Sequence, residues 1–183
     1  MENSKMRVRI AEIANYFGIQ TYLDASTAEL SGGQKQLICL AGIMAMQPEL
    51  LLLDEPTSQL DPIAAGEFFS ALKRINEETG TTVVITEHRY ENLFSIADRV
   101  GFMEKGRVIG NCSPRRAVSE LSGKQDYVNI LPAAMRLYAE TASSTDNAPI
   151  TVREGRSYLR SIIGQKDESE EIGKTNPQKE KRE

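Results

Sequence analysis

The sequence predicts an α/β domain with a mostly parallel sheet, followed by a small helical C-terminal extension. Helical apolar patterns alternate with two short, continuously apolar runs, and this alternation is typical of parallel strands joined by helical crossovers. Each run is followed directly by polar or charged residues. Beyond residue 122 the helical patterns become short and a charged tail follows, which predicts an appendage.

The chain opens with two predicted helices. Apolar residues recur at mostly helical spacing over 8–17, and Gly18 is placed as a helix stop. A polar, turn-forming stretch then leads into Ser31-Gly32-Gly33. The segment 37–44 is strongly apolar and ends before Pro48. We expect a buried helix that begins at the glycine pair.

Two runs have the pattern of buried parallel strands. The segment 49–53 is continuously apolar from Leu50 onward, without alternation, which is typical of a parallel strand covered on both faces. Residues 81–86 contain a second run of the same kind. Between the runs, Asp61-Pro62 is placed to start a helix with proline in its first turn, and Gly80 is placed to end it.

A hairpin is predicted after the second strand. Leu93, Ile96 and Ala97 suggest a short helix, after which two apolar segments flank Glu104-Lys105-Gly106, a turn sequence. These segments are expected to add an antiparallel margin to the parallel sheet.

The C-terminal third has the pattern of a satellite rather than a second core. Residues 131–140 predict a helix, and 142–149 a polar linker. Thr151-Val152-Arg153-Glu154 is a capping-box pattern that opens a final helix to Ile163. Lysine, glutamate and small polar residues dominate 165–183, which predicts disorder. The expected domains are 1–122, 123–164 and 165–183.

Composition narrows the classes of partner. A net charge of -4 and a pI near 5.3 give no electrostatic reason to expect nucleic acid or an anionic membrane surface. No apolar stretch approaches the roughly 20 residues of a spanning helix, and no secretory leader opens the chain. We expect a cytoplasmic protein that reaches a membrane only through a protein partner. Cys39 and Cys112 lack the spacing of a zinc site or disulfide framework.

The residues after the strands suit phosphoryl transfer to water, which needs a metal, a group that orients water, and donors around the γ-phosphate. Asp54 is the candidate for holding Mg²⁺ and Glu55 the candidate base. Ser31-Gly32-Gly33 at a helix start offers a hydroxyl and backbone amides to a phosphate. His88 is the candidate donor to the same phosphate.

A phosphate-cradling loop is absent from the sequence. No window has the pattern Gly-x-x-x-x-Gly-Lys-Ser/Thr, whose amides and lysine hold the phosphates. The nearest candidate, Gly173-Lys174-Thr175, has Glu168 where the first glycine should stand. Tight ATP binding by the chain alone is therefore not expected.

Four motifs in order carry a resemblance to a known family. Leu30-Ser31-Gly32-Gly33-Gln34, Asp54-Glu55-Pro56-Thr57-Ser58, Leu60-Asp61-Pro62 and His88 resemble the signature, Walker B, D-loop and switch-histidine motifs of ABC transporter ATPases. The resemblance implies part of a P-loop NTPase-type ABC cassette. More narrowly, the chain looks like energy-coupling-factor ATPases for vitamin or cobalt uptake. The narrower likeness rests on Thr86-Glu87-His88-Arg89, the hairpin around Gly106, Leu131-Pro132 and Ile150-Thr151-Val152-Arg153-Glu154-Gly155-Arg156.

The resemblance also implies roles. Asp54 would ligate Mg²⁺ through water, Glu55 would activate the hydrolytic water, and His88 would contact the γ-phosphate of ATP. Ser31, Gly32, Gly33 and Gln34 would clasp ATP bound on a partner cassette, while Asp61 would link the two sites. The chain departs from the family pattern because it lacks the phosphate loop and the glutamine loop, and because Leu37 stands where arginine is usual.

Three functions fit these observations. The first is a truncated ATP-hydrolysing subunit of an ABC importer, which couples hydrolysis to solute uptake. Its partners would be a second cassette or the missing N-terminal half, together with a transmembrane subunit. It would lie on the inner face of the cell membrane without inserting into it. The second is a non-catalytic interaction module. The third is a chromosome-maintenance or DNA-repair ATPase head. The acidic charge of the chain and its lack of long heptad segments argue against this third function.

Overall fold

The computed structural model describes residues 3–88, 90–142 and 146–174. The chain forms two compact units, Met1–Asn92 and Leu93–Glu183. The predicted boundary after residue 122 falls inside the second unit and stays a prediction. Within the described ranges, no helix combines the length and hydrophobicity needed to cross a bilayer.

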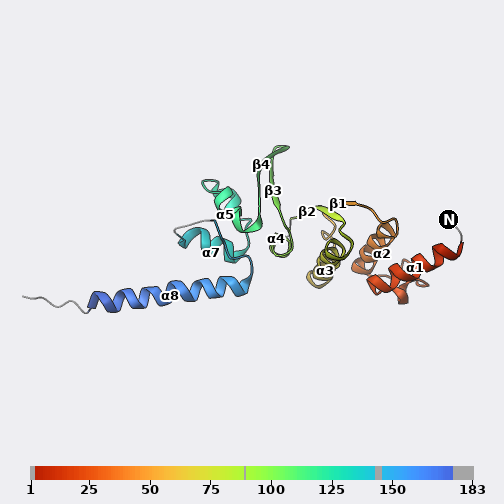
Figure 1. Ribbon diagram of the computed structural model, residues 1–183, viewed down its shortest axis with the longest axis horizontal. Coiled ribbons are helices and arrows are strands. Elements are labelled where there is room, and N and C mark those ends of the chain that lie inside the picture. The colour runs from red at the N-terminus through yellow and green to blue at the C-terminus, as the bar shows by residue number, and fades with distance from the viewer. Residues whose placement is uncertain (1–2, 89, 143–145, 175–183) are drawn as a thin grey trace, which may run out of the picture. The chain divides into compact units, whose positions relative to one another are not determined.

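Helices and strands alternate in the first unit, as predicted (Figure 1). The apolar patterns of this part of the sequence, over 8–17, 37–44, 49–53 and 81–86, each correspond to one of these elements. In chain order they are α1 (Asn3–Phe17), the short 3-10 helix η1 (Gln20–Tyr22), α2 (Gly32–Met44), β1 (Leu50–Asp54), α3 (Pro62–Thr79), β2 (Thr82–Thr86) and the single-turn helix α4 (Tyr90–Leu93), which runs across the boundary between the units.

The helix ends follow from residues with special backbone preferences. Gly18 and Gly80 have φ angles of 68° and 71°, a left-handed conformation that costs glycine little. At the start of α3, the Asp61 carboxylate accepts hydrogen bonds from the backbone N–H of Ile63 (2.9 Å) and of Ala64 (3.0 Å). These bonds satisfy amides that have no partner inside the helix. The predicted start and end of α3 are confirmed.

Strands β1 and β2 form the predicted parallel pair. Leu50 lies opposite Thr82 and Asp54 opposite Thr86, so both strands end at the same edge. Helix α3 packs on one face of the pair, and Leu51 of β1 is only 3% exposed there. The inner face of α3 is almost entirely buried. Its members are Ala65, Phe68, Phe69, Ala71, Leu72 and Ile75.

The other face of this pair is bare, which corrects the expectation that both faces are covered. Leu50, Leu52 and Val84 are 52%, 68% and 51% exposed. The apolar run did identify strands suited to burial, but a run without alternation does not say which segment supplies the cover. Among the described residues of the first unit, nothing covers this face.

The predicted hairpin is present in the second unit. Strand β3 (Val100–Glu104) pairs antiparallel with β4 (Arg107–Cys112), and Lys105 and Gly106 turn with φ angles of 48° and 76°. Two positive φ angles suit the right-handed twist of a two-residue hairpin. The hairpin forms a two-stranded sheet of its own, so the expected antiparallel margin of the parallel sheet is wrong. Because the turn is tight, the backbone hydrogen-bonding groups of β3 and β4 pair with each other.

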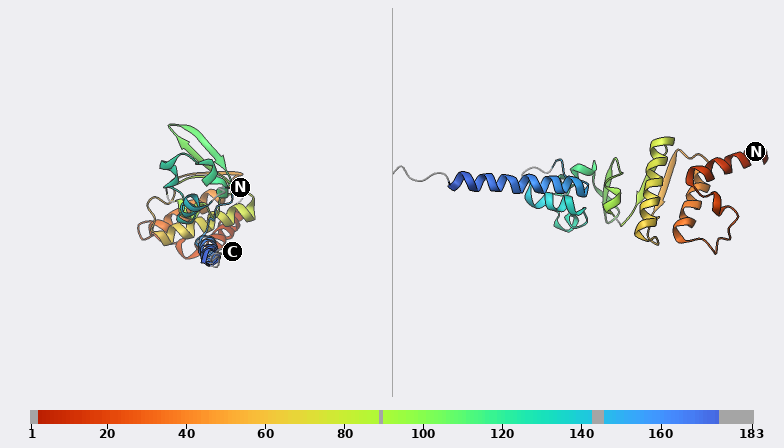
Figure 2. Two further views of the ribbon diagram at one scale, coloured as in Figure 1. Left: turned by 90° about the vertical axis from the view of Figure 1, so that its left-hand side faces the viewer. Right: turned by 90° about the horizontal axis from the view of Figure 1, so that it is seen from below.

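Helices build the rest of the second unit, and their mutual packing gives it a small core. Helix α7 lies along the start of α8 (Figures 1 and 2). A Cβ on Gly155 would lie 2.8 Å from that of Ala134, so glycine permits the close approach. Leu121 and Met135 are fully buried. The elements are the 3-10 helix η2 (Pro114–Arg116), α5 (Ala117–Glu120), α6 (Gln125–Val128), α7 (Ala133–Thr141) and α8 (Val152–Lys174).

The last helix is longer than predicted. The capping box is confirmed, because the Thr151 hydroxyl accepts from the Glu154 amide (3.2 Å) and the Glu154 carboxylate accepts from the Thr151 amide (3.4 Å). Helix α8 continues to Lys174. The predicted disorder of 165–183 stays a prediction, and 175–183 lie outside the described residues. Glutamate, glutamine and lysine cannot build a core but extend an existing helix well.

A second difference concerns the short helix expected around residues 93–97. Helix α4 ends at Leu93, and the chain then turns, with the amides of Ile96 and Ala97 both donating to the Leu93 carbonyl. A segment this short cannot offset the cost of helix nucleation by itself.

Candidate functional site

The parallel pairing brings the predicted catalytic side chains to one edge. Asp54 is the last residue of β1 and lies opposite Thr86, the last residue of β2. Glu55 and His88 follow these strands. Because the carboxyl ends of parallel strands meet at one edge, residues 33 positions apart become neighbours.

Glu55 and His88 are in direct contact. The distance from His88 Nε2 to Glu55 Oε1 is 2.8 Å, and the two side chains are 77% and 46% exposed. Glu55 has a φ of 44°, a left-handed conformation that a glutamate rarely adopts. Its amide donates to the Thr86 carbonyl at 3.0 Å. The chain therefore leaves β1 by a turn that places Glu55 beside His88, the second residue after β2.

Asp54 suits a magnesium site that is completed by other molecules. Its side chain is exposed, and its Oδ1 accepts a hydrogen bond from the Thr86 hydroxyl. Over the described residues, no group of three or more histidine, cysteine, aspartate or glutamate side chains gathers to hold a metal. Magnesium in nucleotide sites is commonly held by one or two carboxylates plus phosphates and water. One exposed carboxylate at a strand end fits that pattern.

Thr57 and Glu87 form a second link between the strand ends, which the sequence did not indicate. Glu87 Oε1 accepts from the Thr57 amide (2.8 Å) and from the Thr57 hydroxyl (2.6 Å). Thr57 is fully buried. Both residues belong to motifs quoted for the family resemblance, but 30 residues separate them. Local periodicity contains no signal for such a pair. Arg89, the next residue of that motif, lies outside the described residues.

The Ser31–Gln34 segment caps α2. Ser31 Oγ accepts from the Gln34 amide (3.3 Å), while Gln34 Oε1 accepts from the Ser31 amide (2.8 Å). This capping box satisfies two helix-end donors reciprocally. A serine hydroxyl that accepts one bond can still donate another. The geometry thus leaves Ser31 able to contact a phosphate oxygen.

Gly32 and Gly33 lie against the start of α3. A Cβ on Gly33 would lie 2.8 Å from the Ala64 Cβ, and one on Gly32 would lie 3.7 Å from Leu60. Gly33 therefore permits close packing of α2 on α3. The structure places the glycines beside the helix that Asp61 caps, whereas Glu55 and His88 contact each other at the strand ends.

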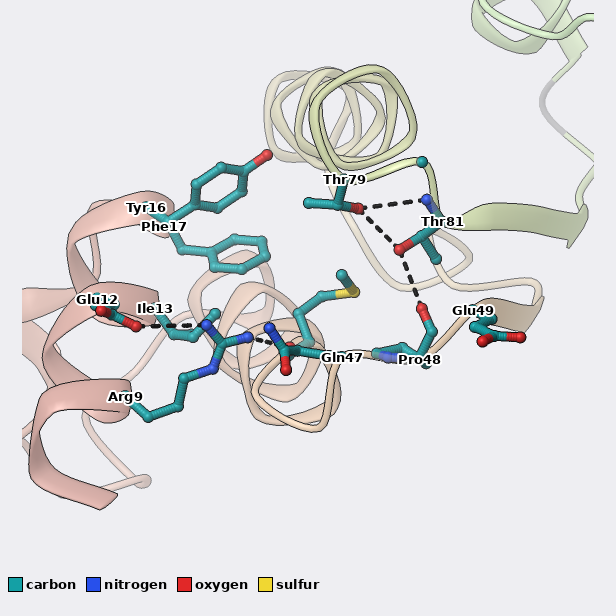
Figure 3. Close-up of a pocket in the computed structure, with 12 residues that line it drawn as sticks. Arg9, Glu12, Ile13, Tyr16, Phe17, Gln47, Pro48, Glu49, Thr79 and Thr81 are labelled. Atoms are coloured by element: carbon teal, nitrogen blue, oxygen red, sulfur yellow. Dashed lines mark hydrogen bonds and ion pairs between the residues drawn. The ribbon is translucent and has the colours of Figure 1, made fainter. Parts of the chain in front are cut away.

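A pocket of about 380 Å³ lies at the opposite ends of the strands (Figure 3). It is lined by α1, by Pro48 before β1 and by Thr81 before β2, whose hydroxyl donates to the Pro48 carbonyl at 3.1 Å. The pKa of Tyr16, which lies in the pocket wall, is raised chiefly by burial and secondly by a side-chain hydrogen bond with Glu78. None of the predicted site residues lines this pocket, so it is separate from the strand-end site.

Comparisons with known proteins identify relatives of the chain. Residues 1–58 match the family model "ABC transporter". A protein of Bacillus cereus described as an ABC transporter ATP-binding protein is 43% identical over 173 residues, which cover 90% of this chain and 31% of the relative. The energy-coupling factor transporter ATP-binding protein EcfA1 of Caldanaerobacter subterraneus is 40% identical over 117 residues, covering 64% of this chain and 42% of that protein.

Solved structures also match the chain. The structure of cbiO1 from Clostridium perfringens, part of the ABC transporter complex cbiONQ, has 29% identity and a TM-score of 0.61. The match covers 78% of this chain and 52% of that one. The ADP conformation of the ATP-binding cassette MJ1267 shares the fold alone, with 22% identity and a TM-score of 0.62.

The fold is that of part of an ATP-binding cassette of the P-loop NTPase type. The chain belongs to the ABC transporter ATP-binding protein family, and its homologues include an energy-coupling-factor ATPase. It spans 31% of the length of the Bacillus cereus relative and 52% of the cbiO1 chain. Members of this family bind ATP, usually with Mg²⁺.

Proposed function

We propose that the chain is an ATP-hydrolysing part of an ABC-type importer, which couples ATP hydrolysis to solute uptake. The contact between Glu55 and His88 carries the proposal. A carboxylate and an imidazole 2.8 Å apart at the carboxyl ends of two parallel strands suit a base and a phosphate contact acting on one reaction.

The strand-end residues would divide the chemistry. The Glu55 carboxylate would accept a proton from the attacking water, and His88 would donate a hydrogen bond to the γ-phosphate. Asp54 would hold Mg²⁺ through a water molecule. When bound, Mg²⁺ gathers the negative charge of the phosphates. The left-handed turn at Glu55 keeps its carboxylate on the side of His88.

The α2 start would serve a nucleotide held elsewhere. Ser31, Gly32, Gly33 and Gln34 lie at the positive end of a helix dipole, which favours an anionic phosphate. We propose that this segment clasps ATP bound on a partner cassette. Asp61, which caps the adjacent α3, would transmit changes between this clasp and the strand ends.

A partner must supply the phosphate cradle, because no such loop occurs in the sequence. The bare sheet face supports this part of the proposal. Leu50, Leu52 and Val84 are each more than half exposed, and parallel sheets are normally covered on both faces. We propose that a polypeptide bearing a phosphate loop, either the N-terminal half of a cassette or a second complete cassette, joins the chain.

The assembly would lie on the inner face of the cell membrane. The cbiO1 protein is described as part of the transporter complex cbiONQ, which supports a transmembrane partner for this chain. Contact with the membrane would run through that partner.

Co-expression provides the test. The chain is produced with the phosphate-loop half of a cassette encoded upstream, and separately with a complete cassette, and ATP hydrolysis is measured for each assembly. We expect hydrolysis above that of either component and its loss on Glu55→Gln. Glu67→Gln, on the exposed side of α3, is the matched control and should leave the rate unchanged.

Two outcomes contradict the proposal. If neither partner raises the rate, the chain does not hydrolyse ATP in these assemblies. If an assembly forms but its rate is indifferent to Glu55→Gln and His88→Ala, the chain acts as a non-catalytic interaction module.

A further inference from the structure

The carboxylate of Glu87 forms hydrogen bonds with residues that follow both strands, β1 and β2. Oε1 accepts from the Thr57 amide (2.8 Å) and hydroxyl (2.6 Å), and Oε2 accepts from the amide of His88 (3.2 Å). One side chain therefore fixes both the turn after β1 and the backbone of His88.

The direction of His88 follows from this arrangement. Successive residues of an extended chain point to opposite sides. The two consecutive side chains contact different residues of the turn after β1, because Glu87 is bonded to the buried Thr57 while His88 contacts Glu55. The His88 side chain is 77% exposed, so packing alone does not hold it in place.

The same carboxylate holds the turn that carries Glu55. Thr57 lies two residues beyond Glu55, whose backbone has a φ of 44°. Such a conformation persists only where the surroundings fix it. Two hydrogen bonds from Thr57 to one half-buried carboxylate are charge-assisted and therefore strong. Releasing Thr57 would free the turn to relax and move Glu55 away from His88.

We propose that Glu87 is a positioning residue, which aligns Glu55 and His88 without touching the reacting atoms. Its alignment of the pair stands on geometry alone, whereas its effect on hydrolysis rests on the proposed function. The two claims can be tested separately because the chain contains one histidine.

Nuclear magnetic resonance of the untagged chain tests the alignment. The ring nitrogen signals of the sole histidine report the hydrogen bond at Nε2. The Glu55→Gln variant gives the reference chemical shifts of the ring nitrogens when the carboxylate partner has been replaced. At constant pH, Glu87→Ala should move the signals most of the way to that position. Glu67→Gln should leave them at the wild-type position.

Two gentler variants keep the test decisive if Glu87→Ala does not fold. Glu87→Gln retains an oxygen for Thr57 but offers an NH₂ group to the His88 amide, so a partial shift is expected. Thr57→Val removes the hydroxyl donor at nearly constant volume and should also shift the ring signals in part. Wild-type ring signals in all folded variants of Glu87 and Thr57 would overturn the proposal.

The assembly with a phosphate-loop partner tests the effect on hydrolysis. Displacement of a catalytic group by about 1 Å can lower a rate by about 100-fold, so Glu87→Ala should lower kcat by about 10- to 100-fold while KM for ATP stays within about twofold. If the ring signals shift but no assembly hydrolyses ATP, the proposed function fails and the alignment stands. If Glu55→Gln abolishes hydrolysis and Glu87→Ala leaves kcat unchanged, the positioning role in hydrolysis is wrong.

Discussion

The His88 imidazole contacts the Glu55 carboxylate at 2.8 Å, although both side chains are largely exposed. Exposed ion pairs contribute at most about 1 kcal/mol to folding, because water already solvates both partners. Glu55 also occupies a left-handed backbone conformation. Folding stability thus gives little reason for this arrangement, which points to a functional one.

Glu55→Gly should stabilise the first unit while it abolishes hydrolysis in the assembly. A left-handed conformation costs a residue with a Cβ about 1–2 kcal/mol, and glycine adopts it freely. After its greater loss of chain entropy, we expect a net gain of about 0.5–1 kcal/mol in the free energy of unfolding. Urea denaturation followed by circular dichroism measures this change. A loss of stability would show that the turn at Glu55 is unstrained.

Gly33→Ala should separate α2 from α3. The added methyl group would lie 2.8 Å from the Ala64 Cβ, and overpacking of this kind costs about 1–3 kcal/mol. Gly42→Ala in the same helix has open space around it and should stabilise by about 0.5–1 kcal/mol.

A double-mutant cycle isolates the contact between the two helices. Ala64→Gly alone weakens α3 by about 1 kcal/mol, yet it should recover part of the stability lost in Gly33→Ala. The expected coupling energy is about 1 kcal/mol. If the stability changes of the two single variants, measured by urea denaturation, sum to that of the double variant, Gly33 and Ala64 are not in contact.

Leu51→Thr and Leu52→Thr should differ in their effect on stability, because adjacent strand residues face opposite sides. Leu51 is 3% exposed and Leu52 is 68% exposed. We expect Leu51→Thr to cost about 2–4 kcal/mol through lost packing and a buried hydroxyl, and Leu52→Thr less than about 0.5 kcal/mol. Equal losses by chemical denaturation of the isolated chain would mean that both faces of β1 are covered.

Acid should destabilise the second unit through Glu154. Hydrogen bonds from Arg115 and from the Ile150 amide lower the pKa of Glu154 from 4.5 to about 2. The pKa of Arg115 is raised by the same pair. Because the folded state binds this proton less readily than the unfolded state, the stabilisation is complete above pH 4.5 and is lost as pH falls toward 2.

Glu154→Gln should reduce this acid sensitivity, and the exposed Glu140→Gln on α7 serves as the control. Thermal unfolding at several pH values between about 2 and 6 gives the comparison. Since Glu154 is 37% exposed, added salt should weaken the effect. Identical pH dependence in both variants would exclude Glu154 as its source.

Residues with strong local preferences allowed much of the fold to be predicted. Gly18, Asp61-Pro62 and Gly80 mark helix boundaries because their backbone or capping chemistry acts within a few residues. The Lys105-Gly106 turn is local in the same sense. Parallel pairing was also predictable, since two apolar runs joined by a helix leave few other arrangements.

Contacts between distant residues limited the prediction of the site. The strand-end motifs brought Glu55 and His88 to one edge, but the bonds from Glu87 to Thr57 depend on side-chain directions that no sequence pattern contains. Burial of Leu52 depends on a covering segment rather than on its own strand. The proposed roles of Ser31 and Asp61 remain predictions.

The bare face of the β1–β2 pair has a consequence for control of the reaction. Two parallel strands with one covered face form a weak platform, and these strands end in the residues proposed for hydrolysis. Covering Leu50 and Leu52 would stiffen that platform at the same moment that a phosphate loop arrives. Hydrolysis would then depend on assembly, so that an unassembled chain consumes no ATP.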